Sequence, residues 1–170
     1  MKKIIYILLL SCILMIGSGK NTFVNNKEIN ITDIRSSIGE YYDELTDGYL
    51  RGEIIVTNKE LTGRDGEITR YVDKNGNILR YTLLLYGETG KAIYDYYFIK
   101  EYIYVNVLDE KYMCPVYEKT TYTLYRTLKE GVIYGNLLYK FEKGEAIESE
   151  LEDLGLLYRT EEELSNLINE

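Results

Sequence analysis

The sequence contains no histidine, one proline and two cysteines. Without histidine the chain cannot pair a cysteine nucleophile with a histidine base, and zinc loses one of its two commonest ligands. Cys114 is the only cysteine outside the N-terminal apolar segment, so we expect no internal disulfide. We expect Cys114 to be a small buried hydrophobic residue, and the hydrophobic core alone to stabilise the fold.

Two segments approach ligand-binding motifs but lack required residues. Gly87–Lys91 resembles a phosphate-binding loop, but Ala92 stands where that motif requires a hydroxyl. A calcium-loop spacing begins at Asp73 but reaches Ile78, where the motif requires glycine. We therefore predict no metal, no cofactor and no enzymatic activity. A hydrolase that works with carboxylates alone is the enzymatic alternative.

The N-terminus has the pattern of a bacterial secretory signal peptide. Met1–Lys3 is positively charged, Ile4–Ile16 is apolar, and Gly17–Gly19 offers small residues for cleavage. The apolar run is short for a membrane span, so we expect export with cleavage near Gly19. As alternatives, Leu9–Cys12 resembles a lipoprotein signal ending at an acylated Cys12, or the segment is retained as an anchor.

The rest of the chain is about the size of one domain. After a signal peptide at residues 1–19, the polar residues 20–31 predict a flexible tether. Residues 32–145 predict an α+β domain, and residues 146–170 predict an acidic helical extension.

Helical spacing of apolar residues predicts an amphipathic helix at Asp33–Thr46, closed by Gly48. Its apolar stripe consists of Ile34, Ile38, Tyr42 and Leu45. Because the sheet is the only large apolar surface available, we expect the stripe to pack against Leu83, Ile103 and Val105.

Alternating apolar residues separated by short turns predict an antiparallel meander of about six strands. Asn75-Gly76 favours a type I′ turn between the first two of them, and Lys129–Gly131 predicts a turn before the last. Gly52–Thr57 has the pattern of an additional short strand. The six strands are expected at residues 68–72, 78–86, 92–98, 102–107, 117–128 and 132–141.

Fourteen of the nineteen tyrosines lie between Tyr71 and Tyr139. Strand propensity and cross-strand pairing explain many of them, but tyrosine is also enriched in protein interfaces. We expect one aliphatic sheet face covered by the helix and one face of hydroxyl-tipped rings. The proposed binding residues on these strands are Tyr94, Tyr96, Tyr102 and Tyr104.

The C-terminal end is strongly acidic. Residues 142–170 hold two basic and ten acidic residues, whereas residues 20–141 hold sixteen and eighteen. Thr160–Glu163 has the sequence of a capping box, and Leu164, Leu167 and Ile168 follow as a narrow apolar stripe. A shorter helix is expected around Ala146–Leu154. The acidic balance argues against a nucleic-acid partner.

Several segments resemble a recurring pattern in small exported bacterial proteins without an assigned function. They are Gly66-Glu67-Ile68, Asn77-Ile78-Leu79, Tyr86-Gly87-Glu88-Thr89-Gly90-Lys91, Tyr96-Tyr97-Phe98 and Ile103-Tyr104-Val105. The resemblance covers about residues 34–140 and implies export and a helix followed by a tyrosine-rich meander. The chain departs from the pattern at Ile99-Lys100-Glu101, where that family often has an Asn-Gly-Lys turn.

Together these observations lead to one functional hypothesis. We expect an exported, non-enzymatic binding domain of the bacterial cell envelope, with a protein or envelope component as its partner. Its contact with the membrane is expected only through the N-terminal segment. A carboxylate-based hydrolase and a purely structural envelope protein are the alternatives.

Overall fold

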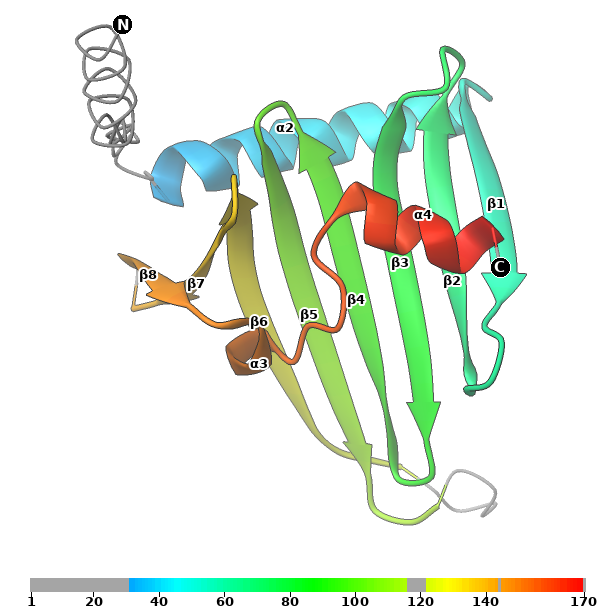
Figure 1. The fold of residues 1–170 in the computed structure, drawn as a ribbon, viewed down its shortest axis with the longest axis vertical. Helices are drawn as coiled ribbons and strands as arrows, with labels where there is room; N and C mark the ends of the chain where they lie inside the picture. The colour runs from blue at the N-terminus through cyan, green and yellow to red at the C-terminus, as the bar shows by residue number, and fades with distance from the viewer. Residues whose placement is uncertain (1–30, 116–121, 144, 170) are drawn as a thin grey trace, which may run out of the picture.

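The computed structural model describes residues 31–115, 122–143 and 145–169. It has an α+β fold with an eight-stranded antiparallel sheet whose strands follow one another in chain order (Figure 1). The predicted signal peptide, its cleavage site, Cys12 and residues 20–30 of the tether lie outside the described residues. The strands are β1 (Ile54–Glu60), β2 (Gly66–Asp73), β3 (Ile78–Gly87), β4 (Gly90–Ile99), β5 (Tyr102–Tyr112), β6 (Thr123–Tyr134), β7 (Leu137–Glu142) and β8 (Glu145–Ser149). The helices are α2 (Ile31–Leu50), α3 (Leu151–Leu154) and α4 (Glu161–Asn169).

Helix α2 is longer than the predicted Asp33–Thr46 because Gly48 does not end it. A Cβ atom on Gly48 would lie 3.1 Å from Cδ1 of Ile54, so this glycine allows the helix to approach β1 closely. The helix ends before Gly52, whose φ of +70° suits a left-handed cap. The N–H of Gly52 donates to the carbonyl of Tyr49 at 3.0 Å.

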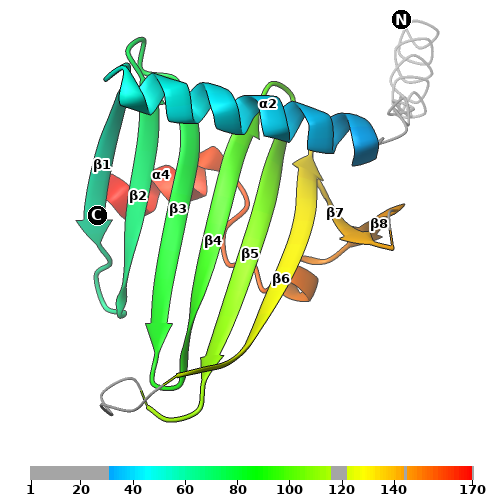
Figure 2. The same cartoon turned by 180° about the vertical axis from the view of Figure 1, so that it is seen from behind.

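Helix α2 crosses one face of the sheet near one end of the strands, and we call this side the α2 face (Figure 2). Ile34 and Ile38 are buried there, as expected. The sheet residues beneath them are Tyr97, Ile99, Tyr104 and Val132. The expected partners Leu83, Ile103 and Val105 belong to the opposite cluster, so that part of the prediction is wrong. Alternation groups residues by face but does not say which face a helix covers.

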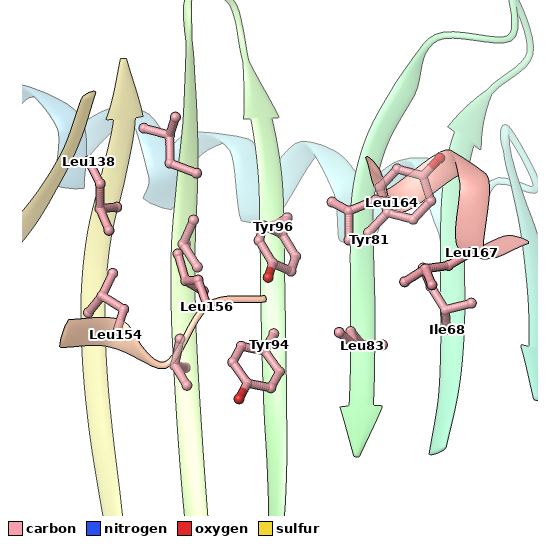
Figure 3. Packing of buried hydrophobic residues seen from close by; sticks show 13 residues of the cluster. Ile68, Tyr81, Leu83, Tyr94, Tyr96, Leu138, Leu154, Leu156, Leu164 and Leu167 are labelled. Carbon is pink, nitrogen blue, oxygen red and sulfur yellow. The ribbon is translucent and has the colours of Figure 1, made fainter. Parts of the chain in front are cut away.

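The opposite side, which we call the C-terminal face, is covered by the chain after β8 (Figure 3). Leu154, Leu156, Leu164 and Leu167 are buried against this face. The Tyr81 hydroxyl lies 2.8 Å from the Ser165 hydroxyl, which fixes α4 over the sheet. The sheet residues buried in this cluster are Ile68, Tyr81, Leu83, Tyr94, Tyr96, Val105, Val107, Ile133 and Leu138.

The helix predicted around Ala146–Leu154 forms only in the second half of that segment, and Ala146–Ser149 belong to strand β8. Phe141 on β7 pairs with Ala146, and only Leu151–Leu154 is helical. The proposed boundary between residues 145 and 146 therefore falls within a strand of the sheet. Because the following residues complete the core, the acidic end is an integral part of the domain.

Strand β6 runs straight through the turn predicted at Lys129–Gly131. A Cβ on Gly131 would lie 2.6 Å from Cδ1 of Leu154 and 2.8 Å from the Tyr139 carbonyl oxygen. This glycine makes room for α3 rather than for a turn. The chain reverses instead at Gly135, which has a φ of +59°.

The hairpin at Asn75-Gly76 is present, but its geometry differs from a type I′ turn. Only Gly76 has a positive φ, at +87°, whereas a type I′ turn requires two such residues. The Asp73 carboxylate accepts the N–H groups of Asn75 and Asn77, each at 2.8 Å. This side chain therefore holds the turn by capping its backbone.

Candidate binding surface on the α2 face

The four tyrosines proposed as a binding face do not share one exposed surface. Tyr94 and Tyr96 lie on the C-terminal face, opposite Val107 and Val105 on β5. Tyr102 and Tyr104 lie on the α2 face. Tyr94, Tyr96 and Tyr104 are all less than a tenth exposed, and Tyr102 is half-buried beside the α2 cluster. These rings form the two cores, because both faces of the central strands are covered near α2 and α4.

Next to the row of Ile99, Tyr102 and Tyr134, four further rows of side chains run across the strands on the α2 face. Residues opposite each other on paired strands share a row, and successive rows on one face lie about 7 Å apart. The aromatic row lies beneath α2 and contains Tyr71, Arg80, Tyr97, Tyr104 and Val132. The polar row follows with Thr69, Thr82, Asp95, Asn106 and Glu130. The apolar row contains Leu84, Ile93, Leu108 and Leu128, and the charged row contains Tyr86, Lys91, Glu110 and Arg126.

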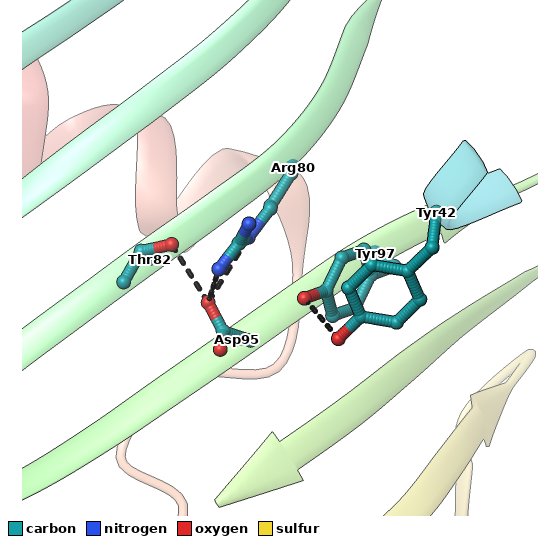
Figure 4. Close-up of polar contacts among 5 residues, drawn as sticks. All are labelled: Tyr42, Arg80, Thr82, Asp95 and Tyr97. Atoms are coloured by element: carbon teal, nitrogen blue, oxygen red, sulfur yellow. Dashed lines mark hydrogen bonds and ion pairs between the residues drawn. The ribbon is translucent and has the colours of Figure 1, made fainter. Parts of the chain in front are cut away.

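An arginine–aspartate pair joins the aromatic and polar rows (Figure 4). The Nε atom of Arg80 donates to Asp95 at 3.0 Å, and the Thr82 hydroxyl donates to the same oxygen at 2.7 Å. The Arg80 guanidinium lies 5.1 and 5.0 Å from the ring centres of Tyr71 and Tyr97. Burial alone would lower the pKa of Arg80, but the Asp95 carboxylate outweighs it and raises that pKa.

Tyr97 connects this pair to α2. Its hydroxyl donates to the hydroxyl of Tyr42, and the two ring centres lie 4.8 Å apart. Burial, reinforced by nearby Asp95, raises the pKa of Tyr97 well above its ordinary value. Tyr97 therefore stays neutral and acts as a hydrogen-bond donor beneath the helix.

Asp95 and Glu130 are the two carboxylates of the polar row, two strands apart on either side of Asn106. The strand spacing places their Cα atoms about 10 Å apart. Asp95 already accepts Arg80 and Thr82, and Glu130 accepts the Tyr104 hydroxyl at 2.6 Å. The Oδ1 atom of Asn106 is buried without a hydrogen-bond partner among the described residues. The bonding of both carboxylates suits a structural role.

The charged row is centred on a buried carboxylate. Glu110 accepts Nζ of Lys91 at 3.2 Å and Nε of Arg126 at 2.6 Å, while only 5% of the residue is exposed. One carboxylate therefore faces two cations. The Arg126 side chain remains 65% exposed and leaves a positive charge at the surface.

Among the described residues, the N-terminal half of β6 has a neighbouring strand on one side only. Strand β5 pairs with β6 along its length, whereas β7 pairs with it only from Gly131 onward. We call the segment Thr123–Lys129 the β6 edge. All residues from Thr123 to Leu128 are exposed, and Leu128 is 59% exposed. The apolar row therefore ends at an open strand edge.

Sequence reasoning did not identify Arg80, Asp95, Glu110 or Arg126. Their partners lie on other strands, and the register brings them together either directly opposite or diagonal to each other. Arg80, Asp95 and Arg126 are single charges within alternating strand patterns, whereas Glu110 lies in the charged run Asp109–Lys111 and carries no such signal.

The residues that the structure describes include no helix long and apolar enough to cross a membrane. Within these same residues, no three acidic or cysteine side chains come together in an arrangement that could hold a metal ion. The sequence matches no protein-family model, and no match was found among curated proteins or solved structures.

Proposed function

We propose that this chain is a non-catalytic binding module that holds a partner protein on the part of its α2 face that α2 does not cover. The observation that carries the proposal is the apolar row. Leu84, Ile93, Leu108 and Leu128 lie in register across four strands, on a part of the face away from α2. Apolar surface rimmed by polar rows is typical of protein interaction sites.

An exposed tyrosine on this surface also supports binding. Tyr86, in the charged row of the α2 face, is 51% exposed. Tyrosine offers a large contact area for a small loss of conformational freedom, which favours it in interfaces. The buried tyrosines stabilise the domain, and the proposed interface uses the exposed Tyr86.

The bonding of the acidic groups favours binding over hydrolysis. Asp95 and Glu130 are engaged by Arg80, Thr82 and Tyr104, so neither is poised to exchange a proton with a substrate. The N-terminal pattern of charged, apolar and small residues supports a location outside the cytoplasm. In this proposal the module works in the cell envelope.

A peptide library displayed on phage would test the proposal. Peptides selected on the purified protein should bind the Leu128→Glu variant at least tenfold more weakly, because a charge would interrupt the apolar row. Fluorescence anisotropy with synthetic copies of the selected peptides measures this change.

The matched control is Leu50→Glu, which alters a 76% exposed leucine at the end of α2. This variant should bind the selected peptides as the parent protein does, and circular dichroism should show both variants folded. Equal affinity for both variants, or failure to select any peptide, would contradict the proposal. The second outcome would favour a purely structural protein.

A further inference from the structure

The β6 edge leaves main-chain groups available for another strand. In an antiparallel pair, every second residue directs its N–H and C=O away from the neighbouring strand. Over Thr123–Lys129 those groups face away from β5, and no described strand lies on that side. An open edge of this kind is a template for an added strand, because main-chain hydrogen bonds then provide affinity.

The charge around this edge is positive on both sides of the sheet. On the α2 face, Lys91 and Arg126 flank the single carboxylate of Glu110. On the other face, the register places Lys111 and Lys129 on either side of Asp109. The protein as a whole has a formal net charge of −8. The β6 edge is therefore a locally cationic part of an acidic molecule.

The side chains of the edge alternate in a way that defines a complementary strand. Arg126 and Leu128 lie on the α2 face, whereas Thr127 and Lys129 lie on the other. A matching strand would carry acidic residues opposite Arg126 and Lys129 and an apolar residue opposite Leu128. In an antiparallel strand this gives the order acidic, apolar, any residue, acidic.

We propose that the β6 edge takes up an extended acidic segment of a partner protein as an added β-strand. This inference rests on the proposed binding function and specifies its ligand. The apolar side chain of the segment would extend the apolar row beyond Leu128. Its acidic residues would neutralise the positive charge that Glu110 leaves unmatched.

A second copy of the chain fits this edge less well. Two β6 strands paired antiparallel about the middle of the edge would place both Arg126 side chains opposite or diagonal to each other. Like charges at such positions are destabilising. An acidic strand meets the same positions with attraction, so charge complementarity favours a partner of opposite sign.

Synthetic peptides can test the added strand directly. A fluorescein-labelled Thr-Glu-Leu-Thr-Glu-Val-Thr peptide should bind the purified protein, with affinity falling as salt is raised from 20 to 200 mM. The same peptide with lysine in place of both glutamates should bind at least tenfold more weakly. Equal binding of the two peptides would overturn the inference.

N-methylation of the peptide distinguishes strand addition from other binding modes. Methyl groups on one alternate set of amides should abolish binding, because those N–H groups would face β6. Methyl groups on the other set should leave the affinity within threefold. Binding that survives both methylation patterns, or that both patterns abolish, would overturn the inference.

Variants of the protein locate the site. Lys129→Glu should reverse the preference between the acidic and lysine peptides, and Arg126→Gln should weaken acidic-peptide binding while leaving Glu110 paired with Lys91. Lys74→Glu, at the opposite end of the strands, is the charge-matched control and should change neither affinity. An unchanged preference in Lys129→Glu would place the peptide elsewhere.

The phage selection separates this inference from the general function. Selected peptides that depend on Leu128 but lack paired acidic residues would overturn the acidic strand and leave the binding module intact. Concentration-dependent dimerisation abolished by the acidic peptide would instead identify a second copy as the occupant, and would also overturn the inference.

Discussion

The buried tyrosines contribute both an aromatic ring and a hydroxyl group to the core. Tyr81, Tyr96 and Tyr97 are among the largest fully buried side chains, and each places a hydroxyl in the interior. Tyr81 bonds to Ser165 and Tyr97 to Tyr42, whereas the Tyr96 hydroxyl has no partner among the described residues. Burial raises the pKa of Tyr96 far above its ordinary value, so it stays neutral. The high tyrosine content therefore mainly reflects the core.

Lys100 has a strained backbone in a tight turn. It joins β4 to β5 with a φ of +51°, which costs a residue with a Cβ atom about 1 kcal/mol or more. Lys100→Gly should therefore raise the free energy of unfolding by about 0.5–1 kcal/mol, after the greater chain entropy of glycine is subtracted. Urea unfolding followed by tyrosine fluorescence measures this gain.

Lys100→Ala serves as the control, since it removes the charge and the long side chain but keeps the Cβ. It should not be more stable than the parent protein. A glycine variant no more stable than the alanine variant would show that strain at this turn is negligible.

At the scale of elements, α4 depends on its first turn. Glu163 accepts the N–H groups of Arg159 at 2.9 Å and Thr160 at 2.8 Å, while its own N–H donates to the Thr160 hydroxyl. The predicted capping box is therefore confirmed. The two N–H groups, with Arg159 foremost, hold the pKa of Glu163 below its usual 4.5.

This cap makes the stability of α4 dependent on pH. Because the folded pKa is below the unfolded one, Glu163 stabilises the protein above about pH 4.5, and this contribution is lost as the pH falls through the folded pKa. Glu163→Gln should thus be less stable than the parent protein at pH 7, with the difference shrinking toward pH 3. Urea unfolding across this range measures the difference.

Glu162→Gln is the control for charge, because it alters an exposed carboxylate in the same turn. Its effect should be small at pH 7. A constant difference between Glu163→Gln and the parent protein at all pH values would contradict the ionised cap.

At the scale of the whole molecule, the sheet is a layer between two covers, α2 on one face and the C-terminal segment on the other. Leu164 on α4 is fully buried against the C-terminal face. Leu164→Ala should lower the free energy of unfolding of the whole protein by about 2–5 kcal/mol, because it leaves a cavity in the shared core. Urea unfolding followed by circular dichroism and by tyrosine fluorescence should show one transition, and the variant's transition should lie at a lower urea concentration with both probes.

The matched control is Leu157→Ala, in the same segment but 55% exposed, and it should cost less than about 0.5 kcal/mol. If α4 melted separately while the transition of the sheet stayed in place, the C-terminal segment would be an independent extension. The expected single transition follows from the shared core.

The sequence by itself determined the antiparallel meander, the burial of Ile34 and Ile38, and the cap at Thr160–Glu163. These features depend on short-range physics: the two-residue period of a strand, the helical spacing of apolar residues and the hydrogen bonds of a capping side chain. They can be recognised within a few neighbouring residues.

Only the tertiary structure decided which segment of the chain covers each face of the sheet and where β6 ends. Gly131 resembles a turn glycine in the sequence, but its missing side chain accommodates Leu154 from a later helix. Register likewise placed Glu110 beside Lys91 and Arg126 on two other strands. Alternation determines which residues of one strand share a face. The opposite partner and the covering layer depend on distant segments, so the apolar row and the β6 edge became visible only in the folded sheet.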